Sequence, residues 1–232
     1  MLFIGWQFII WSVTGAYMVF FDIDYIHGDS LISNQQQPIN PENINVSLVQ
    51  LQATFPQAEK ISLSTFLGQE VYRFSIDDDK HLVSAVSGDL LSPLSKINAI
   101  KTAQYYYTGD GDMIDVRLIV DNPPSELSRG VLPAWQINFS DIGSPSIYVS
   151  ALTGEIVTKR HNFWRIFDWM FRFHVMDYED SEVDNSLLLL LTILSLVAVF
   201  TGIILVYFRV LKKPLTHLKN LSLSRTNKGS NS

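Results

Sequence analysis

Two histidines beside hydrophobic segments are the side chains of this sequence best placed to hold a cofactor. His27 follows the first hydrophobic segment and His174 precedes the second. A neutral imidazole there can ligate a haem iron, or it can hydrogen-bond a lipid headgroup or a backbone carbonyl. Neither hydrophobic segment contains a histidine, whereas a haem held inside a bilayer needs ligands there. We therefore expect a structural role for His174, and a haem between His27 and His174 is the alternative.

Motifs for other kinds of chemistry are missing from the sequence. It contains no Gly-x-Ser-x-Gly, no His-Glu-x-x-His and no glycine-rich phosphate loop. With no cysteine, the chain can form neither a disulfide nor a thiolate metal site. The acidic clusters at residues 77–79, 110–112 and 179–184 lack the extended spacing of a calcium loop. We therefore predict no catalytic residue, no metal and a protein that is not an enzyme.

The charges are divided sharply along the chain. All 23 acidic residues lie between Asp22 and Asp184, where only 11 lysines and arginines accompany them. The last 24 residues carry six basic residues and no acidic one. The two regions are therefore expected to face different surroundings. The acidic surface also argues against a nucleic-acid partner, which requires a basic face.

Two uncharged segments are long enough to cross a lipid bilayer. Residues 187–208 form a run of 22 residues, and at about 1.5 Å per residue it spans the hydrocarbon core of about 30 Å. Residues 1–21 are equally uncharged, and they lack the basic leader and small-residue cleavage site of a signal peptide. We therefore predict two transmembrane helices that interact with the bilayer.

The basic tail at residues 209–232 sets the predicted orientation. Lysine and arginine accumulate on the cytoplasmic side of membrane segments, so both termini are expected in the cytoplasm and the acidic domain outside it. In a bacterium with two membranes, this places the chain in the inner membrane and the domain in the periplasm. Small residues in both spans, such as Ala16 and Gly202, would let the spans pack on each other, and a homodimer is the alternative.

The segment before the second span, residues 161–186, is predicted to be an amphipathic membrane-surface segment. On a helix, His161, Arg165, Asp168 and Arg172 share one face, and aromatic residues occupy the other. Such a helix is suited to lie at the membrane surface before the chain enters the bilayer.

A helical pattern followed by strands occurs twice between the two spans. Apolar residues have helical spacing over residues 44–55, and they alternate over residues 72–76 before a polar turn and a return strand at 81–86. The same order follows downstream, with a helix, two strands and a return strand at residues 97–107, 114–120, 135–139 and 146–150.

This order predicts an α+β fold, with tandem helix-plus-antiparallel-hairpin units between two transmembrane helices. The units cover about residues 44–96 and 97–160 of an extracytoplasmic domain at residues 22–160. Each unit closes with a glycine after a small hydroxyl residue, Gly88 and Gly154, where we expect positive φ.

The closures SGDLLSP at 87–93 and TGEIVTK at 153–159 are shared with a known family. Further likeness lies in FDIDYIHGD at 21–29, FDW at 167–169 and HVMDY at 174–178. With the two enclosing spans, the chain resembles the PepSY domain proteins with PepSY-associated transmembrane helices, over nearly its whole length.

The resemblance implies a function in binding. Related propeptide modules imply an inhibitory or chaperone-like role, so we expect a periplasmic or membrane protein, or a peptide, as the partner. Some larger relatives with four spans look like haem-bearing ferric-siderophore reductases. The alternative is therefore an accessory of iron or siderophore uptake or reduction with a haem-linked redox role.

Overall fold

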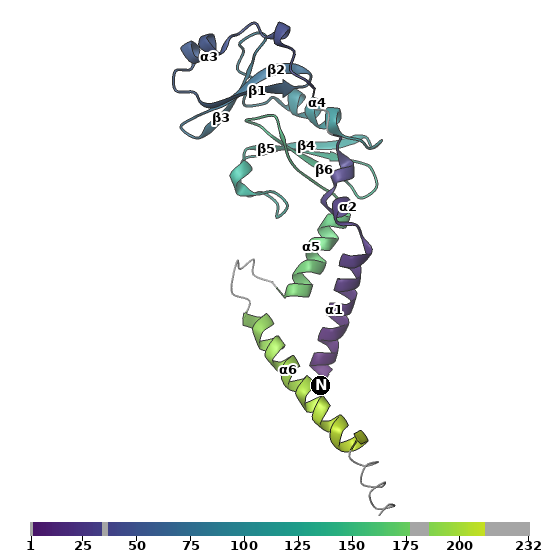
Figure 1. Ribbon diagram of the computed structural model, residues 1–232. Helices are drawn as coiled ribbons and strands as arrows, with labels where there is room; N and C mark the ends of the chain where they lie inside the picture. Colours follow the sequence, from purple (N-terminus) through teal and green to yellow (C-terminus); the bar gives the residue numbers. More distant parts are fainter. Residues whose placement is uncertain (1, 34–36, 177–185, 212–232) are drawn as a thin grey trace, which may run out of the picture. The chain divides into compact units, whose positions relative to one another are not determined.

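The fold is mixed α+β, as the sequence predicts. The computed structural model describes residues 2–33, 37–176 and 186–211, and this part of the chain contains two antiparallel sheets and six α-helices (Figure 1). A helix precedes each sheet along the chain. The helical and strand periodicities of the central region therefore predict the class of fold correctly.

The chain divides into two units. The first unit is Tyr17–Trp169 and holds both sheets, whereas the second combines Met1–Ala16 with Met170–Ser232. The division falls within two helices, α1 (Leu2–Phe20) and α5 (Asn162–Val175).

Three short helical segments connect α1 to the first sheet region. They are α2 (Ile23–His27), η1 (Asp29–Leu31) and η2 (Pro41–Asn43). The Asp22 carboxylate accepts two backbone N–H groups at the start of α2, which satisfies donors that have no partner within the helix. Gly28 ends α2 with φ of 76°, a conformation that favours glycine.

The first sheet is a three-stranded meander. Its strands are β1 (Glu59–Phe66), β2 (Gln69–Ile76) and β3 (Asp79–Ser84), and they pair in that order. The preceding helix is α3 (Leu48–Thr54). The sequence predicts a longer helix over residues 44–55, and the structure shortens it at its N-terminal end.

The reason for the later start of α3 is its cap. The Ser47 hydroxyl accepts the N–H of Gln50, and the Gln50 side chain accepts the N–H of Ser47. This capping box fixes the helix start. Leu51 is then buried against Tyr72 and Phe74, which share one face of β2.

The second sheet is a four-stranded meander that follows α4 (Lys96–Tyr106). Its strands are β4 (Met113–Ile119), β5 (Ala134–Phe139), β6 (Ser146–Ser150) and β7 (Ile156–Arg160), in that order. α4 contacts β4, β5 and β6. The predicted strands at 114–120, 135–139 and 146–150 are confirmed, with small shifts at their ends.

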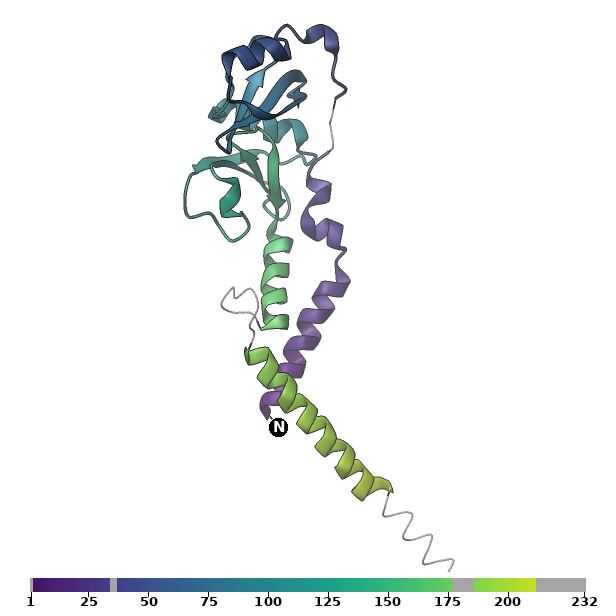
Figure 2. The ribbon, with the colours of Figure 1, turned by 60° about the vertical axis from the view of Figure 1, so that its left-hand side comes forward.

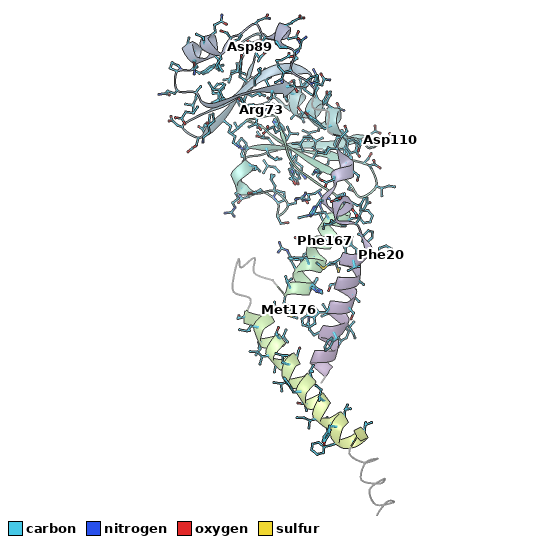
Figure 3. The ribbon with its side chains drawn as sticks, viewed as in Figure 1. Phe20, Arg73, Asp89, Asp110, Phe167 and Met176 are labelled. Atoms are coloured by element: carbon cyan, nitrogen blue, oxygen red, sulfur yellow. The ribbon has the colours of Figure 1, made fainter. Side chains whose placement is uncertain are left out.

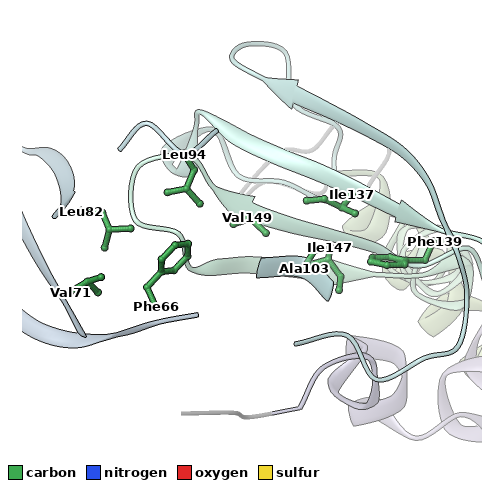
Figure 4. Packing of buried hydrophobic residues seen from close by; sticks show 9 residues of the cluster. All are labelled: Phe66, Val71, Leu82, Leu94, Ala103, Ile137, Phe139, Ile147 and Val149. Carbon is green, nitrogen blue, oxygen red and sulfur yellow. The ribbon is translucent and has the colours of Figure 1, made fainter. Parts of the chain in front are cut away.

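One hydrophobic core joins the two sheets within the first unit. Figures 1 and 2 show the sheets as separate layers of this unit, and Figure 4 shows the side chains between them. Trp135 packs at the edge of this core, where its indole N–H donates to the carbonyl of Leu94 at 2.9 Å. Nine buried residues form the centre of the core: Phe66, Val71, Leu82, Leu94, Ala103, Ile137, Phe139, Ile147 and Val149.

The opposite face of the second sheet is covered by the loop between β4 and β5. This loop contains the short helix η3 (Arg129–Val131). Its Leu127 is buried in a separate cluster with Ile119, Ala134 and Tyr148. Both faces of the second sheet are therefore packed.

Two strands were not predicted. β1 and β7 extend the expected hairpins into meanders of three and four strands. All five residues of β7 are only half-buried, so its sequence gives a weak alternation signal. The two halves share the order of a helix followed by an antiparallel meander but differ in strand number, and their relation as copies of one unit stays a prediction.

The described residues contain one helix that is long and apolar enough to cross a membrane, whereas the sequence predicts two. It is Leu188–Val210, which runs through α6 (Ser186–Val206) and η4 (Tyr207–Leu211). The first expected span forms α1, an uncharged helix of 19 residues. That α1 crosses a membrane stays a prediction.

Candidate functional site

A cleft opens on the first sheet, beside the turn that follows β6. It has a volume of about 260 Å³. β1 is irregular at this place, with a register shift between Glu59 and Ser62 and φ of 52° at Lys60. The shift bends the strand and opens its end. The cleft is lined by Lys60, Ser62, Arg73, Phe74, Ser75, Asp78, Lys80, His81, Thr153 and Glu155.

Arg73 is the most firmly held side chain of the cleft, and Figure 3 labels it among the side chains of the first sheet. Its Nε donates to the Thr153 carbonyl at 3.1 Å, and its Nη1 donates to the Ser64 hydroxyl. The Glu155 carboxylate lies 3.6 Å from Nε. Burial lowers the pKa of the Arg73 guanidinium, although Glu155 opposes this change. An arginine stays protonated near neutral pH, so the cleft has a fixed cation.

Alternation along β2 explains why Arg73 reaches the cleft. Tyr72 and Phe74 point to the face covered by α3, so Arg73 points to the other face, the side of Val71 and the shared core. The side chain of Arg73 is 17% exposed. It therefore stands where the apolar core ends and the open cleft begins.

A second pocket of about 340 Å³ is lined by Arg73 of β2 and by Gly154 and Glu155 of the turn between β6 and β7. Tyr106 of α4 and Ile156 of β7 also line it. The Arg73–Glu155 pair thus lies where the two pockets meet.

The turn between β6 and β7 requires a glycine. Gly154 has φ of 70°, and a Cβ atom there would lie 2.6 Å from the ring of Phe66. Gly88, at the matching closure after β3, has φ of 82°. The positive φ predicted for both glycines is confirmed.

Cations outnumber acids in the cleft although the domain around it is acidic. Lys60, Arg73 and Lys80 line it, against Asp78 and Glu155. Within residues 37–176, neither lysine forms an ion pair. Two free ammonium groups, a fixed guanidinium and serine hydroxyls can bind a carboxylate by charge and hydrogen bonds.

His174, the first of the predicted cofactor residues, contacts α1 within the second unit. Its Nδ1 lies 2.9 Å from the Thr14 hydroxyl oxygen, and the Trp11 indole donates to its carbonyl at 2.8 Å. The Thr14 hydroxyl donates its own proton to the carbonyl of Ile10 at 2.7 Å. The Thr14 oxygen is therefore the acceptor for Nδ1–H, and in neutral His174 the lone pair is on Nε2.

His27, the second of these residues, ends α2 in the first unit. It lines a pocket of about 320 Å³ with β7 residues, where Lys159 pairs with Asp29 at 2.7 Å. Lys159 lowers the pKa of the Asp29 carboxyl by hydrogen bonding and by its charge. His27 and His174 belong to different units, so their pairing around a haem stays a prediction.

His161, placed by the sequence on the polar face of a surface helix, is instead a buried cap. It is 2% exposed. Its Nε2–H donates to the Tyr25 carbonyl at 2.8 Å, and its Nδ1 accepts the Trp164 N–H at 3.3 Å at the start of α5. Burial lowers the pKa of this imidazole, and the nearby cations Arg165 and Arg160 act in the same direction.

Arg165, from the same predicted face, binds the loop that covers the second sheet. Its guanidinium makes two hydrogen bonds of 2.9 Å to the Glu126 carboxylate. The Tyr148 hydroxyl donates to the same carboxylate, and burial and this bond raise the pKa of Tyr148. Arg165 and Glu126 are 39 positions apart, and no local pattern in the sequence predicts their contact.

No three His, Cys, Asp or Glu side chains gather as a metal-ligand set among the described residues. The acidic run at residues 179–184 lies outside the described residues. The same holds for residues 177 and 178 of the HVMDY motif.

Comparison of the chain with protein-family models, with curated proteins and with solved structures finds no match. The resemblance to PepSY domain proteins therefore remains a prediction from the sequence.

Proposed function

We propose that this chain is a membrane-anchored binding protein without enzymatic activity. Its PepSY-like domain holds a segment of a protein or peptide in the cleft beside Arg73. The observation that carries this proposal is the cleft itself, in which Lys60, Arg73 and Lys80 gather positive charge within an otherwise acidic domain.

The charge of the cleft favours a segment with a carboxylate, either an acidic side chain or a chain terminus. Lys60 and Lys80 have no carboxylate partner within residues 37–176, so a ligand does not need to displace one. Arg73 is already oriented by Thr153 and Ser64, which reduces the entropy that binding has to overcome. The second pocket, on the other side of the Arg73–Glu155 pair, gives the neighbouring residues of an extended segment a place to lie.

The proposed anchor consists of two membrane helices. The long apolar helix Leu188–Val210 supports one of them. We propose α1 as the other, because it is uncharged. The basic tail favours cytoplasmic termini, and the domain then lies in the periplasm at the bacterial inner membrane.

Binding of defined peptides to the detergent-solubilised full chain tests the function. The probes are acidic peptides of about eight residues, each made with a free terminal carboxylate and with an amide. We expect the double variant Lys60→Gln/Lys80→Gln to weaken binding roughly tenfold, since two close charges are lost. Raising the salt concentration should weaken binding to the wild type in the same way.

The double variant Lys96→Gln/Lys101→Gln is the matched control. It removes the same charge from α4, and neither residue lines the cleft. Equal losses in both variants would mean that net charge alone attracts the peptides. No binding by the wild type to any of these peptides would remove the support for a carboxylate-binding cleft.

The second candidate function is a haem-linked role in iron or siderophore uptake. It is favoured by one observation, the Thr14 hydrogen bond that leaves the Nε2 lone pair of His174 available. In metal sites, a hydrogen bond at the ring nitrogen that does not bind the metal orients a ligating histidine. His174 would hold the iron, and the haem would supply electron transfer. We rank this function second because it rests on a single nitrogen atom.

A further inference from the structure

β4 is an edge strand that leaves its outer side unpaired. The second sheet has the order β4-β5-β6-β7, and among the described residues no other strand pairs with β4. Its outward N–H and C=O groups are therefore a template for a further strand. Three large apolar residues of β4 are also exposed, Met113 by 37%, Ile114 by 64% and Leu118 by 44%.

The sequence of β4 is complementary to itself under a two-fold axis. If a second copy pairs antiparallel with β4 and the axis passes Val116, then Asp115 of each copy faces Arg117 of the other. The same register brings Ile114, at the irregular end of β4, toward Leu118 of the other copy, so that two exposed apolar residues approach each other. Opposite charges and apolar pairs directly across two strands both stabilise their pairing.

Neighbouring registers are less favourable. An axis through Arg117 would bring two arginines together, and an axis through Asp115 would bring two aspartates together. An axis between Val116 and Arg117 would place each of these residues opposite the other and Asp115 opposite Leu118. Only the axis at Val116 pairs both charges with opposite charges.

We propose that two copies of this chain join through β4 into a continuous eight-stranded sheet. The interface is isologous, because each copy contributes the same strand. Arg117 keeps its hydrogen bond to Gln136 of its own β5 and gains Asp115 of the other copy. The pairing stops at two copies because the two-fold contact uses the free edge of both β4 strands. The irregularity between Met113 and Asp115 ends the regular part of the strand. This inference is independent of the cleft and of its ligand.

The absence of cysteine makes the register directly measurable by disulfide trapping. In the proposed dimer, Val116 faces Val116 of the other copy, so Val116→Cys should form a cross-linked dimer on mild oxidation of the full chain in detergent. Leu118→Cys is the control on the same exposed strand. In the proposed dimer, position 118 of one copy lies four residues along the strand from position 118 of the other. This distance of about 13 Å is beyond the reach of a disulfide.

Charge reversal tests the contact between Asp115 and Arg117. In the Val116→Cys background, Asp115→Arg or Arg117→Asp should lower the cross-linked fraction about tenfold, because like charges then face each other. The double variant Asp115→Arg/Arg117→Asp should restore it. Circular dichroism of each variant checks that the sheet is intact.

The outcomes separate the proposal from its rivals. Cross-linking of Val116→Cys alone, rescued by the double reversal, supports it. Equal cross-linking at positions 116 and 118 would show random collision, and a wild type that is monomeric by light scattering at all concentrations would also overturn the proposal. A dimer held only by the hydrophobic helices would leave position 116 without cross-links, which contradicts it as well.

Discussion

Arg165 donates two parallel hydrogen bonds from one edge of its guanidinium to the Glu126 carboxylate, from Nε to Oε2 and from Nη2 to Oε1, each at 2.9 Å. The Glu126 side chain is only 7% exposed, so this pair replaces water around a buried charge. Glu126 belongs to the loop between β4 and β5, and Arg165 belongs to α5. The contact therefore ties the helix that leaves the domain to the loop that covers the second sheet.

Glu126→Gln should destabilise the first unit by about 2 kcal/mol or more, because it leaves Arg165 without its bidentate partner. Urea denaturation followed by tryptophan fluorescence measures the change. Glu155→Gln is the control, since it removes a carboxylate that is 57% exposed and 3.6 Å from Arg73. An exposed pair of this kind contributes less than about 1 kcal/mol. Equal losses in the two variants would contradict a special role for the buried pair.

The stability of the domain should fall in mild acid because of His161. Burial lowers the pKa of His161 in the folded chain below its ordinary value of 6.5. Above about pH 6.5 the imidazole is neutral in both states, and its contribution to stability is fully present. As the pH falls below 6.5, the unfolded chain binds a proton that the folded chain does not bind, so the free energy of unfolding decreases until the folded pKa is passed.

Denaturation curves at pH 7.5 and 5.5 measure this effect. The difference between the two pH values should be smaller in His161→Gln than in the wild type, because the variant has no imidazole to protonate. An unchanged difference in His161→Gln would show that other groups cause the acid sensitivity.

The proposed topology predicts the behaviour of two reporters. A fluorescent protein fused after Ser232 should be active, since the basic tail is expected in the cytoplasm. Alkaline phosphatase inserted at the exposed Asn122, which works only outside the cytoplasm, should also be active. If both reporters are inactive, and both become active when their positions are exchanged, then the orientation of the chain is opposite to the proposed one.

His174 should have a structural role, and the wild-type protein purified in detergent should then show no Soret band. His174→Ala and Thr14→Val remove the same hydrogen bond, so both should lower the stability by about 1 kcal/mol. Optical spectra and thermal denaturation measure the two effects. A stoichiometric haem band in the wild type that disappears in His174→Ala would favour the haem-linked function instead.

The sequence by itself determined the elements whose signal is local. Alternation of apolar residues placed β2, β4, β5 and β6, because a half-buried strand repeats every two residues whatever it later packs against. The small hydroxyl residue followed by glycine predicted the positive φ of Gly88 and Gly154 in the same way. The 22-residue apolar run predicted the helix at Leu188–Val210, since length and lack of charge are sufficient for that prediction.

Only the tertiary structure decided which distant residues meet. Arg165 and His161 have the spacing of a polar helix face, but a buried carboxylate 39 residues away and the Tyr25 carbonyl turn them toward the domain. The cleft likewise joins residues of β1, β2 and β3 to a turn about 80 residues further along the chain, with Arg73 bound to Thr153. Periodicity specifies which face of an element is apolar, whereas the partner of a buried charge depends on how the elements pack, and a single sequence does not contain that information in any local pattern.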